Sequence, residues 1–142
     1  MKNYEYPDWL VPLEIAIKLK EIGFDKECIF TNSYLTENIC FEIECNDDYY
    51  LSFSDLSLQK NTENNLATIP TWEQVFEWFR EKGYHGVIAV GDESGEVNEY
   101  SYCINYLNEL QCDFEQDSHL TYEEAREALV KALIQTYKNE QL

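Results

Sequence analysis

Cysteine and histidine side chains are the first candidates for chemistry, because thiolates and imidazoles bind zinc and serve as nucleophiles or bases. The chain has five cysteines and two histidines. Cys40 and Cys45 are an odd number of positions apart, so on one strand they face opposite sides and cannot converge on a metal. Cys103, Cys112 and His119 could share a site, but isolated or buried thiols are the expectation. We predict no metal centre. A Cys–His nucleophilic pair stays open, although no cysteine is marked as activated.

Carboxylates are the second candidates. The segment GDESGE offers oxygen atoms of the kind that calcium accepts, from Asp92, Glu93, Ser94 and Glu96. It lacks the spacing of an EF-hand loop, and a solvated hairpin turn is the favoured interpretation. General acid–base catalysis requires carboxylates with separated pKa values in a cleft, and 28 acidic residues bring some together in any fold. An enzyme that uses acids with His85 or His119 is therefore the least favoured class, and His85 is expected in a solvated turn.

Motifs that cradle phosphates or mount a nucleophile do not occur: there is no G-x-x-x-x-G-K-[ST], G-x-G-x-x-G or G-x-S-x-G. We predict no catalytic residue and no cofactor. A module that holds a nucleotide between aromatic rings is the alternative function. The weakness of this alternative is that few basic side chains are available to bind the phosphates. Arg80 and Lys82 are the basic residues nearest the aromatic segment around Trp78.

Two features remain as candidates for binding. The 43 residues from Gly83 to Ala125 contain no lysine or arginine but ten acidic residues. They are Asp92, Glu93, Glu96, Glu99, Glu109, Asp113, Glu115, Asp117, Glu123 and Glu124. A charged run commonly forms only a solvated face; otherwise it engages a basic partner, because complementary charge speeds association.

The second feature is a row of tyrosines, Tyr100, Tyr102 and Tyr106, at the period of one strand face. If the row faces the helices it belongs to the core. If it faces outward, its amphipathic rings suit an interface with a partner or a second copy of the chain. The predicted partner-binding residues are Asp92, Glu93, Glu96, Glu99, Tyr100, Tyr102 and Tyr106.

The net charge of −18 limits the class of partner. Residues 1–70 carry 13 acidic against 5 basic side chains and residues 71–142 carry 15 against 5, so the acidity is spread along the chain. Such a protein repels nucleic-acid phosphates and anionic lipids, which leaves a basic protein as the expected partner. There is no apolar run near the roughly 20 residues that span a bilayer and no export signal, so we expect a cytoplasmic protein with reduced thiols.

Apolar periodicity predicts the elements that position these residues. Helices are expected at 11–24, 71–82 and 121–138, and strands at 27–35, 37–46, 49–56, 86–90 and 100–107, with a polar loop at 57–70. The predicted fold is a single α+β domain, residues 1–142, in which three helices pack on an antiparallel sheet of about five strands in the order α-β-β-β-α-β-β-α.

Local signals fix the helix ends. Thr71 with Gln74 and Thr121 with Glu124 have the spacing of capping boxes, and Gly23 and Gly83 are natural stops. The dense aromatic residues of the segment TWEQVFEWFREKGY lie at helical spacing. We expect them to fill a core rather than to form a binding surface.

Three segments, LVPLEIAIKLKEIGFD, PTWEQVFEWFREKGY and TYEEAREALVKALIQTYK, resemble those of a widespread group of small uncharacterised proteins of gut Bacteroidetes and their phages. The resemblance covers the three helices, and the strands between them are less similar. It transfers no catalytic or binding residue. It implies a bacterial or phage cytoplasmic setting and is compatible with a role on a mobile element.

The leading hypothesis is a non-enzymatic protein whose acidic, tyrosine-bearing surface binds another protein. In a phage setting, the partner would be a host defence or nucleic-acid-binding protein, whose basic site the acidic chain would occupy.

Overall fold

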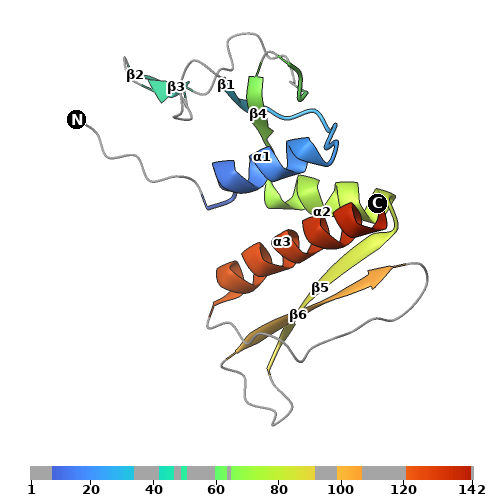
Figure 1. Ribbon diagram of the computed structural model, residues 1–142. Helices are drawn as coiled ribbons and strands as arrows, with labels where there is room; N and C mark the ends of the chain where they lie inside the picture. Colours follow the sequence, from blue (N-terminus) through green and yellow to red (C-terminus); the bar gives the residue numbers. More distant parts are fainter. Residues whose placement is uncertain are drawn as a thin grey trace. The chain divides into compact units, whose positions relative to one another are not determined.

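The computed structural model describes residues 8–33, 42–46, 49–50, 60–63, 65–91, 99–106 and 121–141 (Figure 1). The chain divides into two compact units, Met1–Gln74 and Val75–Leu142, and the division falls inside helix α2 (Trp72–Glu81). That residues 1–142 form one domain stays a prediction. The α+β class, the three helices and the antiparallel pairing of the strands are confirmed. No helix in the described ranges is both long enough and apolar enough to cross a membrane.

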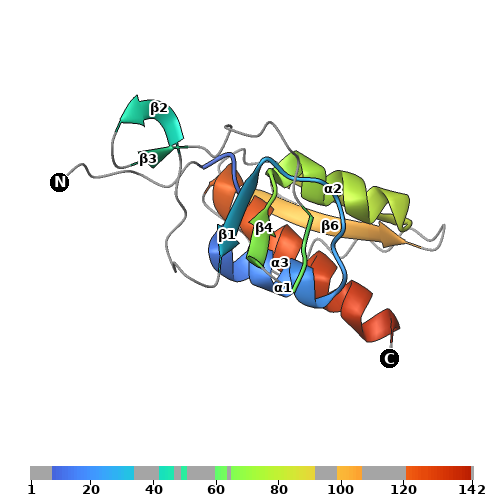
Figure 2. The same cartoon turned by 90° about the horizontal axis from the view of Figure 1, so that it is seen from above.

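In the first unit, helix α1 (Leu13–Glu21) packs against a two-stranded ladder of β1 (Phe30–Ser33) and β4 (Asn65–Ile69). Both views place the ladder over the helix (Figures 1 and 2). The helix ends as predicted at Gly23, which has a φ of 93°. The Gly23 and Phe24 N–H groups donate to the carbonyls of Lys20 and Leu19, which is the Schellman arrangement that a left-handed glycine permits.

Strand β4 corrects the prediction of a loop over residues 57–70. It pairs antiparallel with β1, with Phe30 opposite Ile69, and Ala67, Thr68 and Ile69 are buried. Asn61, in the polar stretch before β4, connects this strand to the end of α1. Its side chain accepts a hydrogen bond from the Thr68 N–H and donates one to the Phe24 carbonyl, both at 2.9 Å. The short apolar run lacks alternation, so only its pairing with β1 identifies it as a strand.

The predicted strands at 37–46 and 49–56 are described in part. Within them β2 (Glu42–Asn46) pairs antiparallel with β3 (Tyr49–Tyr50). Within the described ranges the strands pair in twos, β1 with β4, β2 with β3 and β5 with β6, and not as one sheet of about five strands. Alternation identifies strands, but it does not determine which strands become neighbours.

In the second unit, helix α3 (Tyr122–Glu140) contacts both strands of a hairpin formed by β5 (Tyr84–Val90) and β6 (Tyr100–Tyr106) (Figure 1). The hairpin pairs without a register shift from Tyr84 opposite Tyr106 to Val90 opposite Tyr100. Strand β5 begins two residues before the predicted one, so His85 lies in a strand and not in a turn.

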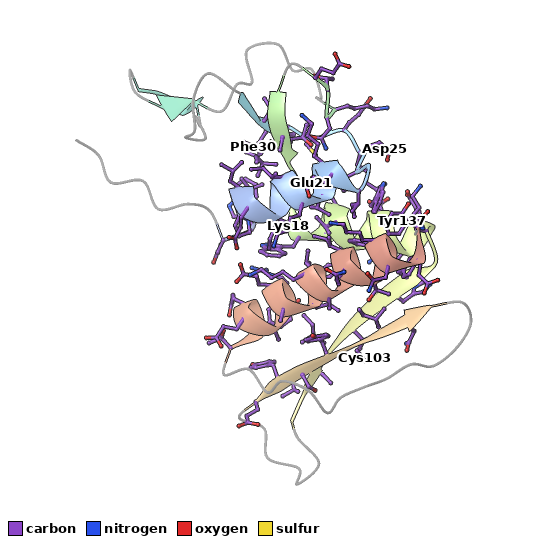
Figure 3. All side chains as sticks on the ribbon, in the orientation of Figure 1. Lys18, Glu21, Asp25, Phe30, Cys103 and Tyr137 are labelled. Atoms are coloured by element: carbon purple, nitrogen blue, oxygen red, sulfur yellow. The ribbon has the colours of Figure 1, made fainter. Side chains whose placement is uncertain are left out.

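The aromatic residues of α2 form core, as predicted, except that Phe76 is only half-buried. Trp72, Val75, Trp78 and Phe79 are buried. In the second unit the ring of Tyr137, labelled on α3 in Figure 3, lies 5.2 Å from Trp78, 6.2 Å from Phe79 and 5.6 Å from Tyr84, each at an edge-to-face angle. This geometry is the favoured one for aromatic pairs. The cluster holds the end of α3 against α2 and the start of β5.

Candidate interaction surface

The tyrosine row faces helix α3. Directly paired residues of an antiparallel ladder point to the same side, so Tyr102 and Ile104 lie on the same side as Ile88 and Gly86. A Cβ built on Gly86 would lie 2.9 Å from Cδ2 of Leu129, which identifies this side as the one that α3 covers. Tyr100 and Tyr102 are both half-buried there, and the side chain of Tyr106 is outside the described set. The row is therefore not an outward-facing sheet surface.

Tyr100, at the start of β6, makes a contact that the sequence did not reveal. Its ring lies 6.2 Å from that of Tyr122, the first residue of α3, at 83°. Tyr122 is 43% exposed, and the guanidinium of Arg126 lies over its ring at 5.7 Å. The exposed ring of Tyr122 therefore lies beside Tyr100, at the point where β6 and α3 both begin.

Three carboxylates accompany this aromatic pair. Glu99 precedes Tyr100 and is half-exposed, and Glu123 and Glu124 follow Tyr122 and are exposed. The Thr121 hydroxyl accepts from the Glu124 N–H at 3.1 Å, so the cap fixes the backbone from which both glutamates project. We call Glu99, Tyr100, Tyr122, Glu123 and Glu124 the tyrosine–glutamate patch.

The patch includes two of the seven predicted partner-binding residues, Glu99 and Tyr100. Asp92, Glu93 and Glu96 lie outside the described residues, and the side chain of Tyr106 is not described. Tyr102 lies on the α3 side of β6. Sequence reasoning missed Tyr122. Its signal was an aromatic residue in a first helical turn, beside two acids and away from the apolar positions Ala125 and Leu129.

Acidic side chains stay at the surface throughout the described part of the chain. No aspartate or glutamate whose side chain the structure describes is buried. Glu127 forms an ion pair of 3.8 Å with Lys131 one turn later on α3, where both side chains are exposed. Such an arrangement provides a charged exterior rather than convergent carboxylates in a cleft.

The thiols and histidines do not converge among the described residues, where no three His, Cys, Asp or Glu side chains could hold a metal ion. Cys103 (Figure 3) is buried on β6 opposite Val87, and His85 is exposed opposite Asn105. Cys40, Cys112 and His119 lie outside the described residues, and Cys45 is described in its backbone only.

Cys28 is buried in the first unit, where its thiol donates to the Lys26 carbonyl over 3.5 Å. Burial raises the pKa of this thiol to about 11, a rise that hydrogen bonding to Thr68 partly offsets. The thiol is therefore protonated at neutral pH, and a thiolate nucleophile at this position is disfavoured.

Comparison with known proteins adds no relative to this description. No protein-family profile matches the chain, and no curated protein or solved structure matches it significantly.

Proposed function

We propose that this chain is a non-enzymatic acidic protein that binds a partner protein with a basic surface through the tyrosine–glutamate patch. The observation that carries the proposal is the contact of Tyr100 with the exposed Tyr122, bordered by Glu99, Glu123 and Glu124.

The aromatic pair would supply the apolar centre of the interface. Tyrosine is enriched at interfaces because a large ring buries much apolar area while its hydroxyl keeps a hydrogen-bonding partner. The Tyr122 ring has two described contacts. One is with the ring of Tyr100 in β6, and the other is with the guanidinium of Arg126, one turn further along α3. A ring that is already positioned loses little side-chain entropy on binding.

The carboxylates would supply attraction and orientation. All ten charged residues between Gly83 and Ala125 are acidic, and three of them belong to the patch. A surface of one sign attracts a basic partner before contact and raises the association rate, an effect that salt screens. Arg126 is the nearest basic residue along α3, and it lies over the Tyr122 ring.

From the resemblance that the sequence alone suggested, to proteins of gut Bacteroidetes and their phages, we infer a cytoplasmic setting and a partner in a bacterial host. A host defence or nucleic-acid-binding protein has the required basic surface. In this proposal the acidic chain occupies that surface in place of nucleic acid.

Affinity capture tests the proposal. The tagged full chain is used as bait in a lysate of a gut Bacteroidetes bacterium, at about 50 mM and about 500 mM salt, because screening becomes strong over this range. Two variants are compared with the wild type: Tyr122→Ala, and the pair Glu123→Gln with Glu124→Gln. We expect the wild type to capture one basic protein in stoichiometric amount at low salt and to release it at high salt. Both variants should bind this protein about tenfold more weakly, a loss of binding free energy of about 1.4 kcal/mol.

The matched control is the pair Glu14→Gln with Glu21→Gln, which removes the same charge from exposed positions of α1. It should retain the partner. If the control loses the partner as fully as the patch variants do, net charge and not the patch determines binding. If no partner is captured at low salt, the proposed function is wrong.

A further inference from the structure

The outer edge of strand β5, from Gly86 to Val90, is not paired with another strand in the described part of the chain. The Gly91 N–H donates to the Glu99 carbonyl at 2.8 Å, so this pair is hydrogen-bonded, and such pairs alternate along an antiparallel ladder. The next hydrogen-bonded pairs are therefore Ala89 with Ser101 and Val87 with Cys103. It follows that the N–H and C=O groups of Gly86, Ile88 and Val90 point away from β6. No other described strand pairs with this edge.

The edge lacks the features that protect most edge strands. Natural edges carry lysine, proline or a bulge, which prevent pairing with another chain. Strand β5 reads YHGVIAV, which includes none of these and no charged residue, and its ladder with β6 has no register shift. In a chain with 27% charged residues, seven uncharged positions in a regular edge strand favour strand addition.

We propose that two copies of this chain pair antiparallel through their β5 edges, with Val87 at the two-fold axis. In this register Gly86 lies opposite Ile88 of the second copy, and Val90 lies opposite Tyr84 of the second copy. The backbone groups of Gly86 and Ile88, which point away from β6, then pair with those of Ile88 and Gly86 of the second copy on both sides of the axis. A self-complementary interface of this kind is the one that two-fold symmetry requires.

Side-chain exposure fits this register. Val87 is 43% exposed on the side away from α3, and at the axis it would lie against its own counterpart. That position is a non-hydrogen-bonded pair, in which the two backbones and their side chains approach most closely. Val90 is 56% exposed, and the dimer would place it beside Tyr84 of the second copy. Two exposed apolar side chains in each copy would thus lose contact with water.

Charge selects a second copy in this antiparallel orientation. The segment Arg80–Glu81–Lys82, with a net charge of +1, comes shortly before β5. Asp92 and Glu93 come directly after β5, and Glu99 pairs at its end. Antiparallel pairing brings the basic end of one strand to the acidic end of the other. Parallel pairing would bring like charges together. This local attraction opposes the long-range repulsion between two chains of charge −18.

Helix α3 also has room in the dimer. Neighbouring strands are about 4.8 Å apart and a helix with its side chains is about 10 Å wide, so one helix covers two strands. In each copy α3 covers the β5–β6 pair. The dimer would have a four-stranded sheet with one α3 per pair of strands, on the same face.

Light scattering coupled to size-exclusion chromatography tests the dimer with the full chain. We expect a mass of twice 16.8 kDa for the wild type and 16.8 kDa for Val87→Lys, which places two like charges at the axis. Val87→Thr, which keeps a β-branched side chain without charge, should remain dimeric. A monomeric wild type at about 100 μM, or a dimeric Val87→Lys, would overturn the proposal.

Amide hydrogen exchange on the wild type gives a second, independent measurement, which holds even if Val87→Lys does not fold. The amides of Gly86, Ile88 and Val90 should exchange about tenfold more slowly in concentrated than in dilute samples, because only the dimer bonds them. The Val87 and Ala89 amides, which already pair with β6, serve as internal references. Equal exchange of Gly86, Ile88 and Val90 at both concentrations would contradict the pairing. The patch variants should stay dimeric, which separates this inference from the proposed partner binding.

Discussion

Burial determines the chemistry of Cys28. Its thiol pKa is raised to about 11, above the ordinary value of an unfolded chain, so the folded state favours the protonated thiol. This contribution to stability is complete below the unfolded pKa and is lost as the pH rises through the folded one. We predict that the free energy of unfolding falls between about pH 9 and pH 11 by about 1.4 kcal/mol per unit of pKa difference.

The measurement is urea unfolding of the wild type and Cys28→Ala across this pH range. Other groups titrate in both proteins, so the difference between the two curves reports Cys28. The alanine variant should be less stable at neutral pH and approach the wild type as the pH rises. Parallel curves would show that Cys28 does not carry the linkage.

A glycine is required at position 86 because α3 lies close to β5 there. An added Cβ would lie 2.9, 3.0 and 3.2 Å from three side-chain carbons of Leu129, which is buried. We predict that Gly86→Ala destabilises the chain by about 1–3 kcal/mol, as overpacking does. The double variant Gly86→Ala with Leu129→Val should cost less than the sum of the two single changes. Additive costs in urea unfolding would show that the clash is not the cause.

At the scale of elements, the two predicted capping boxes differ. At α2 both bonds form: the Gln74 N–H donates to the Thr71 hydroxyl at 3.1 Å, and the Thr71 N–H donates to the Gln74 side chain at 2.9 Å. Gln74 also donates from its amide to the Glu27 carbonyl at 3.0 Å. At α3 the structure shows the bond from the Glu124 N–H to Thr121.

We therefore predict that Gln74→Ala destabilises the chain more than Glu124→Ala does. A capping bond is worth about 0.5–2 kcal/mol, and Gln74 loses two bonds where Glu124 loses a favourable charge near a helix N-terminus, worth about 0.3–1 kcal/mol. Thermal unfolding followed by circular dichroism measures both, with Thr71→Ala and Thr121→Ala as the paired cap deletions. An equal loss for Gln74→Ala and Glu124→Ala would contradict this difference.

At the scale of the whole molecule, the net charge of −18 opposes folding through self-repulsion. We predict that the melting temperature rises as salt increases from about 10 mM to about 150 mM, because the Debye length falls from about 30 Å to about 8 Å. Partner capture should weaken over the same range, since the attraction across the patch is screened. Calorimetry at fixed pH measures the first effect. A melting temperature that falls with added salt would show that attractive pairs outweigh repulsion.

The sequence by itself determined the elements whose signals are local. Thr71, Gln74, Gly23 and Gly83 marked helix ends that the structure confirms, and the apolar spacing of α2 marked its buried face. These signals are readable because a cap or a helical repeat involves residues within four positions of one another. Glu99 and Tyr100 of the patch were also identified, from charge and strand period.

The tertiary structure alone decided which distant residues meet. Strand β4 exists as a partner of β1, with Ile69 opposite Phe30, and its own residues carry too weak a pattern to identify it. Helix α3 covers the side of β6 that carries the tyrosine row, so the row faces the helix and not the solvent. The same packing places Tyr122 in contact with Tyr100. The pKa of Cys28, which burial raises, is partly lowered by hydrogen bonding to Thr68, 40 positions away. Such contacts form between segments far apart in the chain, so no local period encodes them.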